Sequence, residues 1–164
     1  MAIFDSGLSS GVPYLVMELL EGRSLADELR ETPVLSADRC VTIAIPVCRV
    51  LAEAHAVGVL HRDIKPENIF LHRVRDEEFV KLVDFGIAKL VRGDDADDPM
   101  SQSLVIGTPH YLAPERLRRA DYDERADIYS LGVMLYRMLG GALPLEGEHL
   151  ADWLAAIKIG RAHV

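Results

Sequence analysis

Apolar residues recur at helical spacing after Ser36, and this periodicity predicts an amphipathic helix there. Pro46 lies within the predicted helix, where a proline removes one backbone hydrogen bond. We therefore expect a kink at Pro46 and not a break. The apolar positions follow the pattern i, i+3, i+4, i+7, i+8 and i+11 and are Cys40, Ile43, Ala44, Val47, Cys48 and Leu51.

A second long helix is predicted from Arg125 to Leu139, where apolar residues lie on both sides of the helical wheel. A helix that is apolar nearly all round is typical of a buried position, so we expect this helix to be enclosed. One face carries Ile128, Leu131, Gly132, Leu135, Met138 and Leu139, and the opposite side carries Val133, Met134 and Tyr136.

Two shorter helices and one loop complete the helical part of the pattern. Residues 24–27 read Ser-Leu-Ala-Asp, which has the form of a capping box and predicts a short helix to about Glu31. Residues 151–159 predict a last helix. Residues 93–99 combine turn-forming residues with four aspartates, which predicts a mobile loop.

Short apolar runs predict two pairs of strands. Residues 3–5 and 14–17 flank a Gly/Ser loop and form a candidate hairpin. Residues 68–71 and 80–83 bracket the charged segment 72–78, which we expect to be a turn.

Composition indicates one ordinary globular domain, since 49% of the 164 residues are apolar and 27% are charged. The net charge is −8, and cations cluster only at Arg116, Arg118 and Arg119, which argues against a nucleic-acid partner. No apolar run approaches the roughly 20 residues that cross a bilayer, and the N-terminus lacks the basic region of a secretory signal. We therefore expect no membrane segment in this chain.

The two cysteines, Cys40 and Cys48, lie eight residues apart in the first predicted helix. A straight helix holds positions at this spacing beyond disulfide reach. We interpret both as buried small apolar residues in a reducing, cytoplasmic setting.

Three motifs carry the chemistry of the chain. Residues 61–68 read His-Arg-Asp-Ile-Lys-Pro-Glu-Asn and match the pattern H-R-D-x-x-x-x-N. Asp84-Phe85-Gly86 begins sixteen positions after Asn68, and residues 107–115 read Gly-Thr-Pro-His-Tyr-Leu-Ala-Pro-Glu. Each short motif arises often by chance, whereas all three in this order and spacing are much more specific.

On these motifs the chain resembles a eukaryotic-like, bacterial-type serine/threonine protein kinase. The resemblance implies an α+β, protein-kinase-like fold with a mainly α-helical C-lobe and a remnant N-lobe β-hairpin. Residues 1–20 would be a remnant of the N-lobe sheet with the hinge, and residues 21–164 a partial C-lobe of one incomplete kinase domain.

Phosphoryl transfer needs an aligned hydroxyl and cations that hold the developing negative charge. Asp63 is placed to accept the proton of the substrate hydroxyl, and Lys65 to face the transferring phosphate. Asn68 and Asp84 offer oxygen ligands of the kind that Mg²⁺ prefers. The resemblance makes Asp63 the catalytic base, Asn68 and Asp84 the ligands of Mg²⁺, and Thr108 a contact to Asp63 and Lys65 near the acceptor site. Lys65 also points to the serine/threonine subclass.

From the sequence alone, residues 16–22 are an apolar strand that ends in a glycine turn. The resemblance makes this segment the hinge that binds the adenine of ATP. Met17 would be the gatekeeper, and the backbone groups of Glu18 and Leu20 would bond the adenine edge. Phe70 would form part of the adenine floor.

Three further motif residues are interpreted as structural. The resemblance implies that His61 packs against Phe85 and that Asp127 hydrogen-bonds the catalytic-loop backbone. Glu115 would pair with an arginine late in the domain.

Arg62 supports a regulatory hypothesis, because a guanidinium beside the catalytic carboxylate can bind a phosphate on the activation loop. Ser101 and Ser103 are the candidate acceptors, with Thr108 a weaker one. The alternative is that Arg62 pairs with local acids from residues 94–98 and that nothing is phosphorylated.

The sequence contains no Gly-x-Gly-x-x-Gly motif, and its first lysine is Lys65. A kinase domain uses a glycine-rich lid and a strand lysine to hold the phosphates of ATP. We therefore expect negligible transfer by these 164 residues alone and interpret them as a truncated domain.

The predicted function is ATP-dependent transfer of the γ-phosphoryl group to protein Ser or Thr, carried here by a partial domain. One alternative is an inactive kinase fragment or pseudokinase that acts as a binding module. A second is a small-molecule phosphotransferase of related fold, which the segment 107–115 disfavours because it serves protein substrates in the family.

Overall fold

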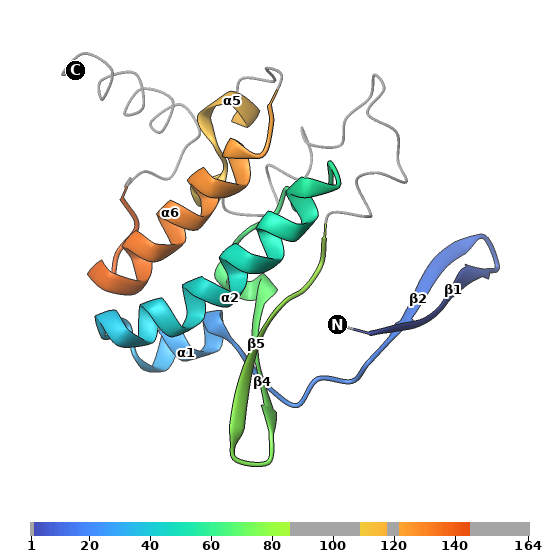
Figure 1. Ribbon diagram of the computed structural model, residues 1–164, viewed down its shortest axis with the longest axis horizontal. Helices are drawn as coiled ribbons and strands as arrows, with labels where there is room; N and C mark the ends of the chain where they lie inside the picture. Colours follow the sequence, from blue (N-terminus) through green and yellow to red (C-terminus); the bar gives the residue numbers. More distant parts are fainter. Residues whose placement is uncertain (1, 86–108, 118–121, 145–164) are drawn as a thin grey trace.

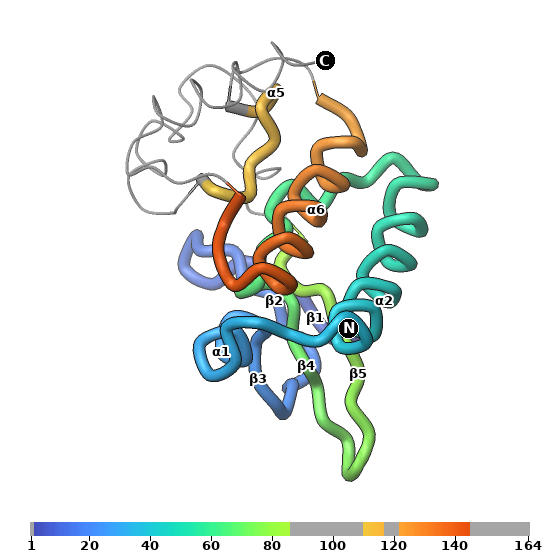
Figure 2. The backbone as a smooth tube through the Cα atoms, turned by 90° about the vertical axis from the view of Figure 1, so that its left-hand side faces the viewer, coloured from blue at the N-terminus to red at the C-terminus, as the bar shows by residue number. Residues whose placement is uncertain are grey.

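The computed structural model describes residues 2–85, 109–117 and 122–144 of the chain. Its elements combine helices with antiparallel strands, as expected for an α+β fold. Helices α2 (Ala37–Ala56) and α6 (Arg125–Gly140) lie side by side (Figures 1 and 2). A short helix α1 (Leu25–Glu31) and a three-stranded sheet lie beneath them, and a separate hairpin projects to one side.

The projecting hairpin is formed by β1 (Ile3–Ser9) and β2 (Val12–Met17). Ser9 pairs with Val12, so the turn contains only Ser10 and Gly11. Both turn residues have positive φ, 52° and 80°, which is typical of the tight turns that match strand twist. The predicted hairpin is therefore present, with longer strands and a shorter loop than the apolar runs indicated.

The second sheet has the order β3–β4–β5. Strand β3 (Gly22–Ser24) was not predicted, since three residues carry too little pattern. It pairs with β4 (Ile69–Val74), and Gly22 lies so close to this strand that an added Cβ would stand 2.0 Å from the carbonyl oxygen of Leu71. Only glycine fits this position, where φ is +134°.

The prediction that residues 72–78 form a turn is wrong, because β4 and β5 (Glu77–Leu82) extend through most of that segment. The turn consists of Arg75 and Asp76 alone. Charged residues are compatible with strands here because this part of the ribbon is exposed, and Arg73 faces Glu78 across it.

Helix α1 begins at the predicted capping box. The amide of Asp27 donates to Ser24 Oγ at 3.1 Å, and the amide of Ser24 donates to Asp27 Oδ2 at 2.9 Å. Ser36 caps α2 in a similar way, by accepting from the amide of Arg39. Helix α2 then runs unbroken through Pro46, as expected.

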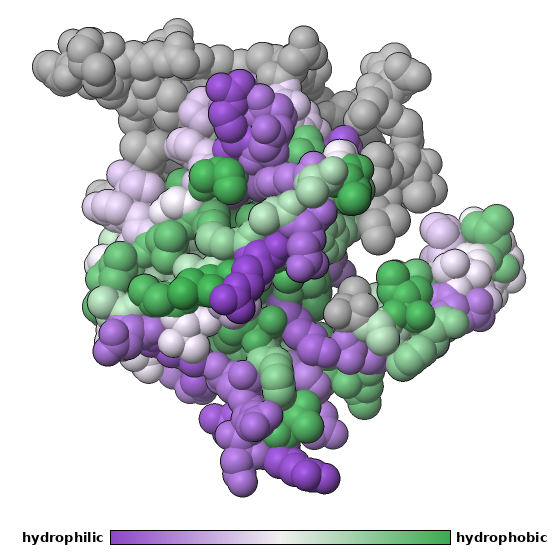
Figure 3. Space-filling view, viewed as in Figure 1, coloured by the Kyte–Doolittle hydropathy of each residue, from purple (hydrophilic) through white to green (hydrophobic). Residues whose placement is uncertain are grey.

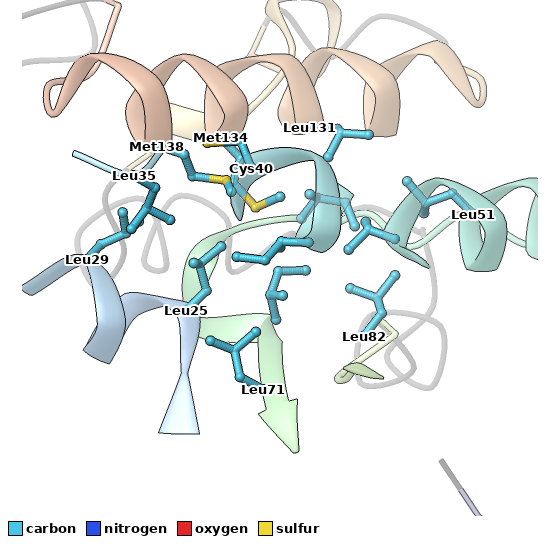
Figure 4. Packing of buried hydrophobic residues seen from close by; sticks show 14 residues of the cluster. Leu25, Leu29, Leu35, Cys40, Leu51, Leu71, Leu82, Leu131, Met134 and Met138 are labelled. Atoms are coloured by element: carbon cyan, nitrogen blue, oxygen red, sulfur yellow. The ribbon is translucent and has the colours of Figure 1, made fainter. Parts of the chain in front are cut away.

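The core lies between α1, α2, α6 and the second sheet (Figure 4). The predicted stripe of α2 is buried except for Cys48, so the interpretation of Cys48 as a buried residue is wrong. At 3.6 residues per turn, Cys48 lies about 80° round the helix from Cys40, at the edge of the stripe. The cluster consists of Leu25, Leu29, Leu35, Cys40, Ile43, Val47, Leu51, Ile64, Ile69, Leu71, Leu82, Leu131, Met134 and Met138.

Helix α6 has the predicted bounds to within one residue, and it ends before Gly141, whose φ of 75° is typical of a helix C-terminus. The prediction that it is buried all round is wrong, because Ile128, Tyr136 and Leu139 are each about half exposed. Two polar residues, Asp127 and Ser130, lie on the buried face because their side chains hydrogen-bond backbone groups. The buried positions are Ala126, Asp127, Ser130, Leu131, Val133, Met134 and Met138.

Several predicted features lie outside the described residues: the loop at 93–99, the helix at 151–159, and the residues Ser101, Ser103 and Thr108. Within the described part of the chain, no helix combines the length and apolar character that a bilayer crossing requires.

Candidate active site

The catalytic-loop motif is anchored to α6 by Asp127, which is 2% exposed. Asp127 Oδ2 accepts from the amide of His61 at 2.8 Å, and Oδ1 accepts from the amide of Arg62 at 2.9 Å. His55 Nε2 lies 2.9 Å from the same carboxylate. The predicted contact of Asp127 with the catalytic-loop backbone is confirmed. One buried carboxylate thus fixes the backbone immediately before Asp63.

His61 connects the two motif segments that carry the acidic residues. Its ring is fully buried, with Nε2 3.0 Å from the carbonyl oxygen of Val83 and Nδ1 3.3 Å from the amide nitrogen of Asp63. It also packs against Phe85, with 4.6 Å between the ring centroids, as the resemblance implied. Asp63 and Asp84 therefore both lie beside this one ring.

These contacts require neutral imidazole, because Nε2 donates to a carbonyl while Nδ1 accepts from an amide. Burial lowers the pKa of His61, which agrees with the neutral form. In the unfolded chain the pKa is about 6.5, so there the ring takes up a proton more readily.

We expect the free energy of unfolding to decrease as the pH falls below about 6.5, because the unfolded state then binds a proton that folded His61 refuses. Above that pH the contribution is fully present. The slope from this one group is at most about 1.4 kcal/mol per pH unit. Urea unfolding between pH 5 and 8, compared with His61→Leu, checks this. An equal pH dependence in the variant would show that other groups are responsible.

Asp63 is surrounded by the polar groups of its own loop. Lys65 Nζ lies 2.9 Å from Asp63 Oδ2, and Asn68 Nδ2 donates to the same oxygen at 3.0 Å. Asn68 Nδ2 also lies 2.7 Å from the carbonyl oxygen of Asp63. The carboxylate is about one third exposed and is thus held in place yet accessible.

The hairpin of β4 and β5 brings Asn68 next to Asp84. Asn68 immediately precedes β4, and the amide of Val83, just after β5, donates to its carbonyl oxygen at 2.9 Å. Asp84 follows directly, is exposed, and has a φ of 58°, a region that aspartate tolerates better than most residues. The backbone thus places both residues at one end of the hairpin, where Asn68 contacts Asp63.

The residues at this end fit a magnesium ion. Asn68 uses its Nδ2 on Asp63, so Oδ1 is the atom of this side chain that could coordinate a cation, and the carboxylate of Asp84 is a second possible ligand. No cluster of three His, Cys, Asp or Glu side chains with metal-binding geometry occurs among the described residues. A cation at this place would accordingly depend on the amide of Asn68 together with carboxylates and phosphate oxygens.

Two of the four predicted adenine residues are connected through Lys81. Lys81 Nζ donates to Glu18 Oε1 at 2.6 Å, and in the strand register Lys81 pairs with Phe70. The hydrogen bond from Lys81, followed by one from the amide of Ala2, lowers the pKa of Glu18 to about 2. The ion pair thus joins the segment after β2 to the sheet that carries Phe70.

The other two predicted adenine residues flank Glu18 along the chain. Met17 ends β2, pairs with Ile3 and is 38% exposed. Leu20 is half-buried. Neither shows a described contact that defines its role.

Arg62 lies in the left-handed region with a φ of 69°, which costs a non-glycine residue about 1 kcal/mol or more. Its Nε is buried and has no hydrogen-bond partner among the described residues. Its guanidinium carbon lies 5.7 Å from the ring centroid of Tyr122. Both proposed sets of partners for Arg62, the serines and the acids at 94–98, lie outside the described residues.

Sequence reasoning missed three residues that contact the site: Lys81, Arg116 and Tyr122. Arg116 donates to the carbonyl oxygen of Arg62, and its guanidinium also lies over the ring of Tyr122. In the sequence, Lys81 is one of many charged residues near the predicted strands. Arg116 is one of three arginines within four residues. To predict the roles of these residues, one would need to know which distant segments of the chain lie next to each other.

Comparison with known proteins agrees with the geometry. The family model for the protein kinase domain matches residues 2–160. Serine/threonine-protein kinase Pkn1 of Myxococcus xanthus is 45% identical over 161 residues, which cover 97% of this chain and 22% of that protein. Serine/threonine-protein kinase PknL of Mycobacterium tuberculosis is 41% identical over 148 residues, covering 90% of this chain and 36% of that protein.

The chain therefore spans between about a fifth and about a third of the length of these relatives. The match nevertheless extends over almost all of its own residues and includes the catalytic-loop and Asp-Phe-Gly motifs. The chain belongs to the protein kinase family.

Proposed function

We propose that this chain carries the catalytic loop of a serine/threonine protein kinase, which transfers the γ-phosphoryl group of ATP to protein hydroxyls. The observation that supports this most is that Lys65 and Asn68 both contact Asp63 Oδ2, at 2.9 and 3.0 Å, at the end of the hairpin that leads into Asp84. The relatives at 41–45% identity are named as serine/threonine kinases.

Each residue of the group has a distinct role in this proposal. Asp63 accepts the proton of the acceptor hydroxyl and orients its oxygen toward the phosphorus. Lys65, now paired with Asp63 at 2.9 Å, turns toward the transferred phosphoryl group and stabilises its charge. Thr108, which lies outside the described residues, would contact both near the acceptor. Mg²⁺, held by Asn68 and Asp84, would neutralise the phosphate oxygens.

The nucleotide site in this proposal lies between the hinge and β4. The backbone of Glu18 and Leu20 bonds the adenine edge, Met17 limits the pocket as gatekeeper, and Phe70 forms its floor. The division into a hinge-bearing part at 1–20 and a C-lobe part at 21–164 follows the same assignment. A cytoplasmic location, with no nucleic-acid partner, agrees with the free Cys40 and Cys48 and the net charge of −8.

A phosphorylation assay on the full-length protein tests the function. With radiolabelled ATP, Mg²⁺ and a mixture of protein substrates, we expect label on serine and threonine and none on tyrosine. Chelation of Mg²⁺ should abolish the label, and adding Mg²⁺ back should restore it. Label that persists without a divalent cation, or that appears only on small molecules, would contradict the proposal.

The ion pair between Glu18 and Lys81 gives a prediction for nucleotide binding. Lys81→Met removes the group that joins Glu18 to the sheet that carries Phe70, so we expect the KM for ATP to rise about fivefold with little change in kcat. Lys81→Arg is the matched control, because it can still bond Glu18. Steady-state kinetics measure both. An unchanged KM for ATP in Lys81→Met would show that the position of Glu18 does not affect ATP binding.

We propose that Ser101 or Ser103 is phosphorylated and that the guanidinium of Arg62 binds this phosphate. The bond would order the activation segment. The support is the buried Nε of Arg62, which lacks a partner among the described residues, next to the catalytic aspartate. Phosphopeptide mapping of the active protein, with and without Ser101→Ala and Ser103→Ala, tests it.

One observation favours the alternative of an inactive kinase fragment that acts as a binding module. The hairpin of β1 and β2 is exposed on both faces, and its apolar surface is visible in green in Figure 3. Phe4, Leu8 and Val12 are each at least 65% exposed. Such a surface is typical of a contact site for another segment or protein. Full activity of the whole protein would exclude the inactive reading.

A further inference from the structure

Residue 62 is held at both of its backbone polar groups by charged side chains of opposite sign. Its amide donates to the carboxylate of Asp127, and its carbonyl oxygen accepts from the guanidinium of Arg116. Hydrogen bonds to charged groups are stronger than those between neutral groups. Asp127, on α6, therefore holds the peptide that joins His61 to Arg62, and Arg116 holds the next peptide, which joins Arg62 to Asp63.

Arg116 is itself well fixed. It lies in the short helix α5 (Pro114–Leu117), directly after the Ala-Pro-Glu motif, and is only 8% exposed. Its amide donates to the carbonyl oxygen of Ala113, and its guanidinium carbon lies 5.1 Å from the ring centroid of Tyr122. The contact with the ring and the bond to the Arg62 carbonyl together restrict the guanidinium to few orientations.

Tyr122 links the two arginines, because the guanidinium of Arg62 lies 5.7 Å from the same ring centroid. Two like charges at one aromatic ring repel each other, and the ring and the Arg62 carbonyl offset part of that repulsion. The left-handed φ of 69° at Arg62 adds strain. Such a backbone persists only where its surroundings determine it, which is what Asp127 and Arg116 together do.

We propose that Arg116 is a positioning residue, which fixes the peptide between Arg62 and Asp63 and thereby the catalytic carboxylate. The inference deepens the proposed function and rests on it for its effect on catalysis. Its structural part, the immobilisation of residues 61–63, can be measured without any activity.

Amide hydrogen exchange followed by NMR tests the structural part on the full chain. In Arg116→Met we expect the amides of residues 61–63 to exchange about tenfold faster, since the partly buried carbonyl of Arg62 loses a charged donor. Amides in the middle of α2 should keep their rates. Arg116→Lys retains a cationic donor and should restore protection to within about twofold. Arg49→Met, which removes an exposed arginine of α2, is the matched control and should change nothing.

Kinetics of the full-length protein test the catalytic part. We expect Arg116→Met to lower kcat about tenfold with an unchanged KM for ATP, and Arg116→Lys to recover most of the loss. If Arg116→Met does not fold, Arg116→Gln takes its place in both measurements. Exchange rates that are unchanged at 61–63, or that rise equally in α2, would overturn the inference. Absence of transfer by the unsubstituted protein would instead overturn the proposed function and leave the exchange result standing.

Discussion

Replacing Asp63 by asparagine is expected to lower kcat for phosphoryl transfer by the full-length protein about 10³-fold. In the proposed function the carboxylate accepts the hydroxyl proton, and an amide cannot do so at neutral pH. Lys65 also loses the anion that now holds its Nζ at 2.9 Å. The KM for ATP should change little, because Asp63 belongs to the acceptor side of the site. Initial rates at saturating substrate, with ATP varied separately, measure both quantities.

The fold should tolerate this substitution, which makes the result interpretable. The backbone amide of Asp63 donates to the ring of His61, and its backbone carbonyl accepts from the side chain of Asn68. Asparagine retains both backbone groups. Asp76→Asn, in the exposed turn between β4 and β5, makes the same chemical change away from the site and should be fully active. Activity of Asp63→Asn within tenfold of the unsubstituted protein would rule out a base role for this residue.

The features that could be predicted from the sequence are those with a local signal. The capping box at Ser24 involves residues three apart, and it starts α1 where the pattern placed it. Five of the six positions in the predicted stripe of α2 are buried, and the catalytic-loop motif placed Asp63, Lys65 and Asn68 in one short segment, where they make contact. In each case the residues that interact are near neighbours along the chain.

The features that could not be predicted depend on pairing between distant segments. Helix α6 has apolar residues on several sides, and its packing against other elements, α2 among them, decides that Met134 is buried while Ile128 is exposed. The strands β4 and β5 extend through a charged segment because the ribbon faces solvent, which composition does not show. Lys81 bonds Glu18, which is 63 positions away along the chain, and Arg116 bonds Arg62, which is 54 positions away.

Asp127→Ala is expected to lower the free energy of unfolding by about 3 kcal/mol or more. The carboxylate is 2% exposed and accepts from two backbone amides, those of His61 and Arg62. Alanine leaves both donors buried without a partner, at about 1–3 kcal/mol each. The strained backbone at Arg62 also loses one of its two restraints. Urea unfolding followed by circular dichroism, at constant pH, measures the change.

Asp127→Asn separates the charge from the hydrogen bonds. The amide retains one acceptor oxygen, so it can satisfy one of the two backbone donors, while its Nδ2 faces the other. We therefore expect Asp127→Asn to lose less stability than Asp127→Ala. Amide exchange should become faster at residue 61 or at residue 62, but not at both. Asp38→Ala, at an exposed position in the first turn of α2, should cost less than about 1 kcal/mol. If Asp127→Ala were as mild as Asp38→Ala, the catalytic loop would have to keep its shape without its anchor on α6, and the position of Asp63 would then depend on His61 and Arg116 instead.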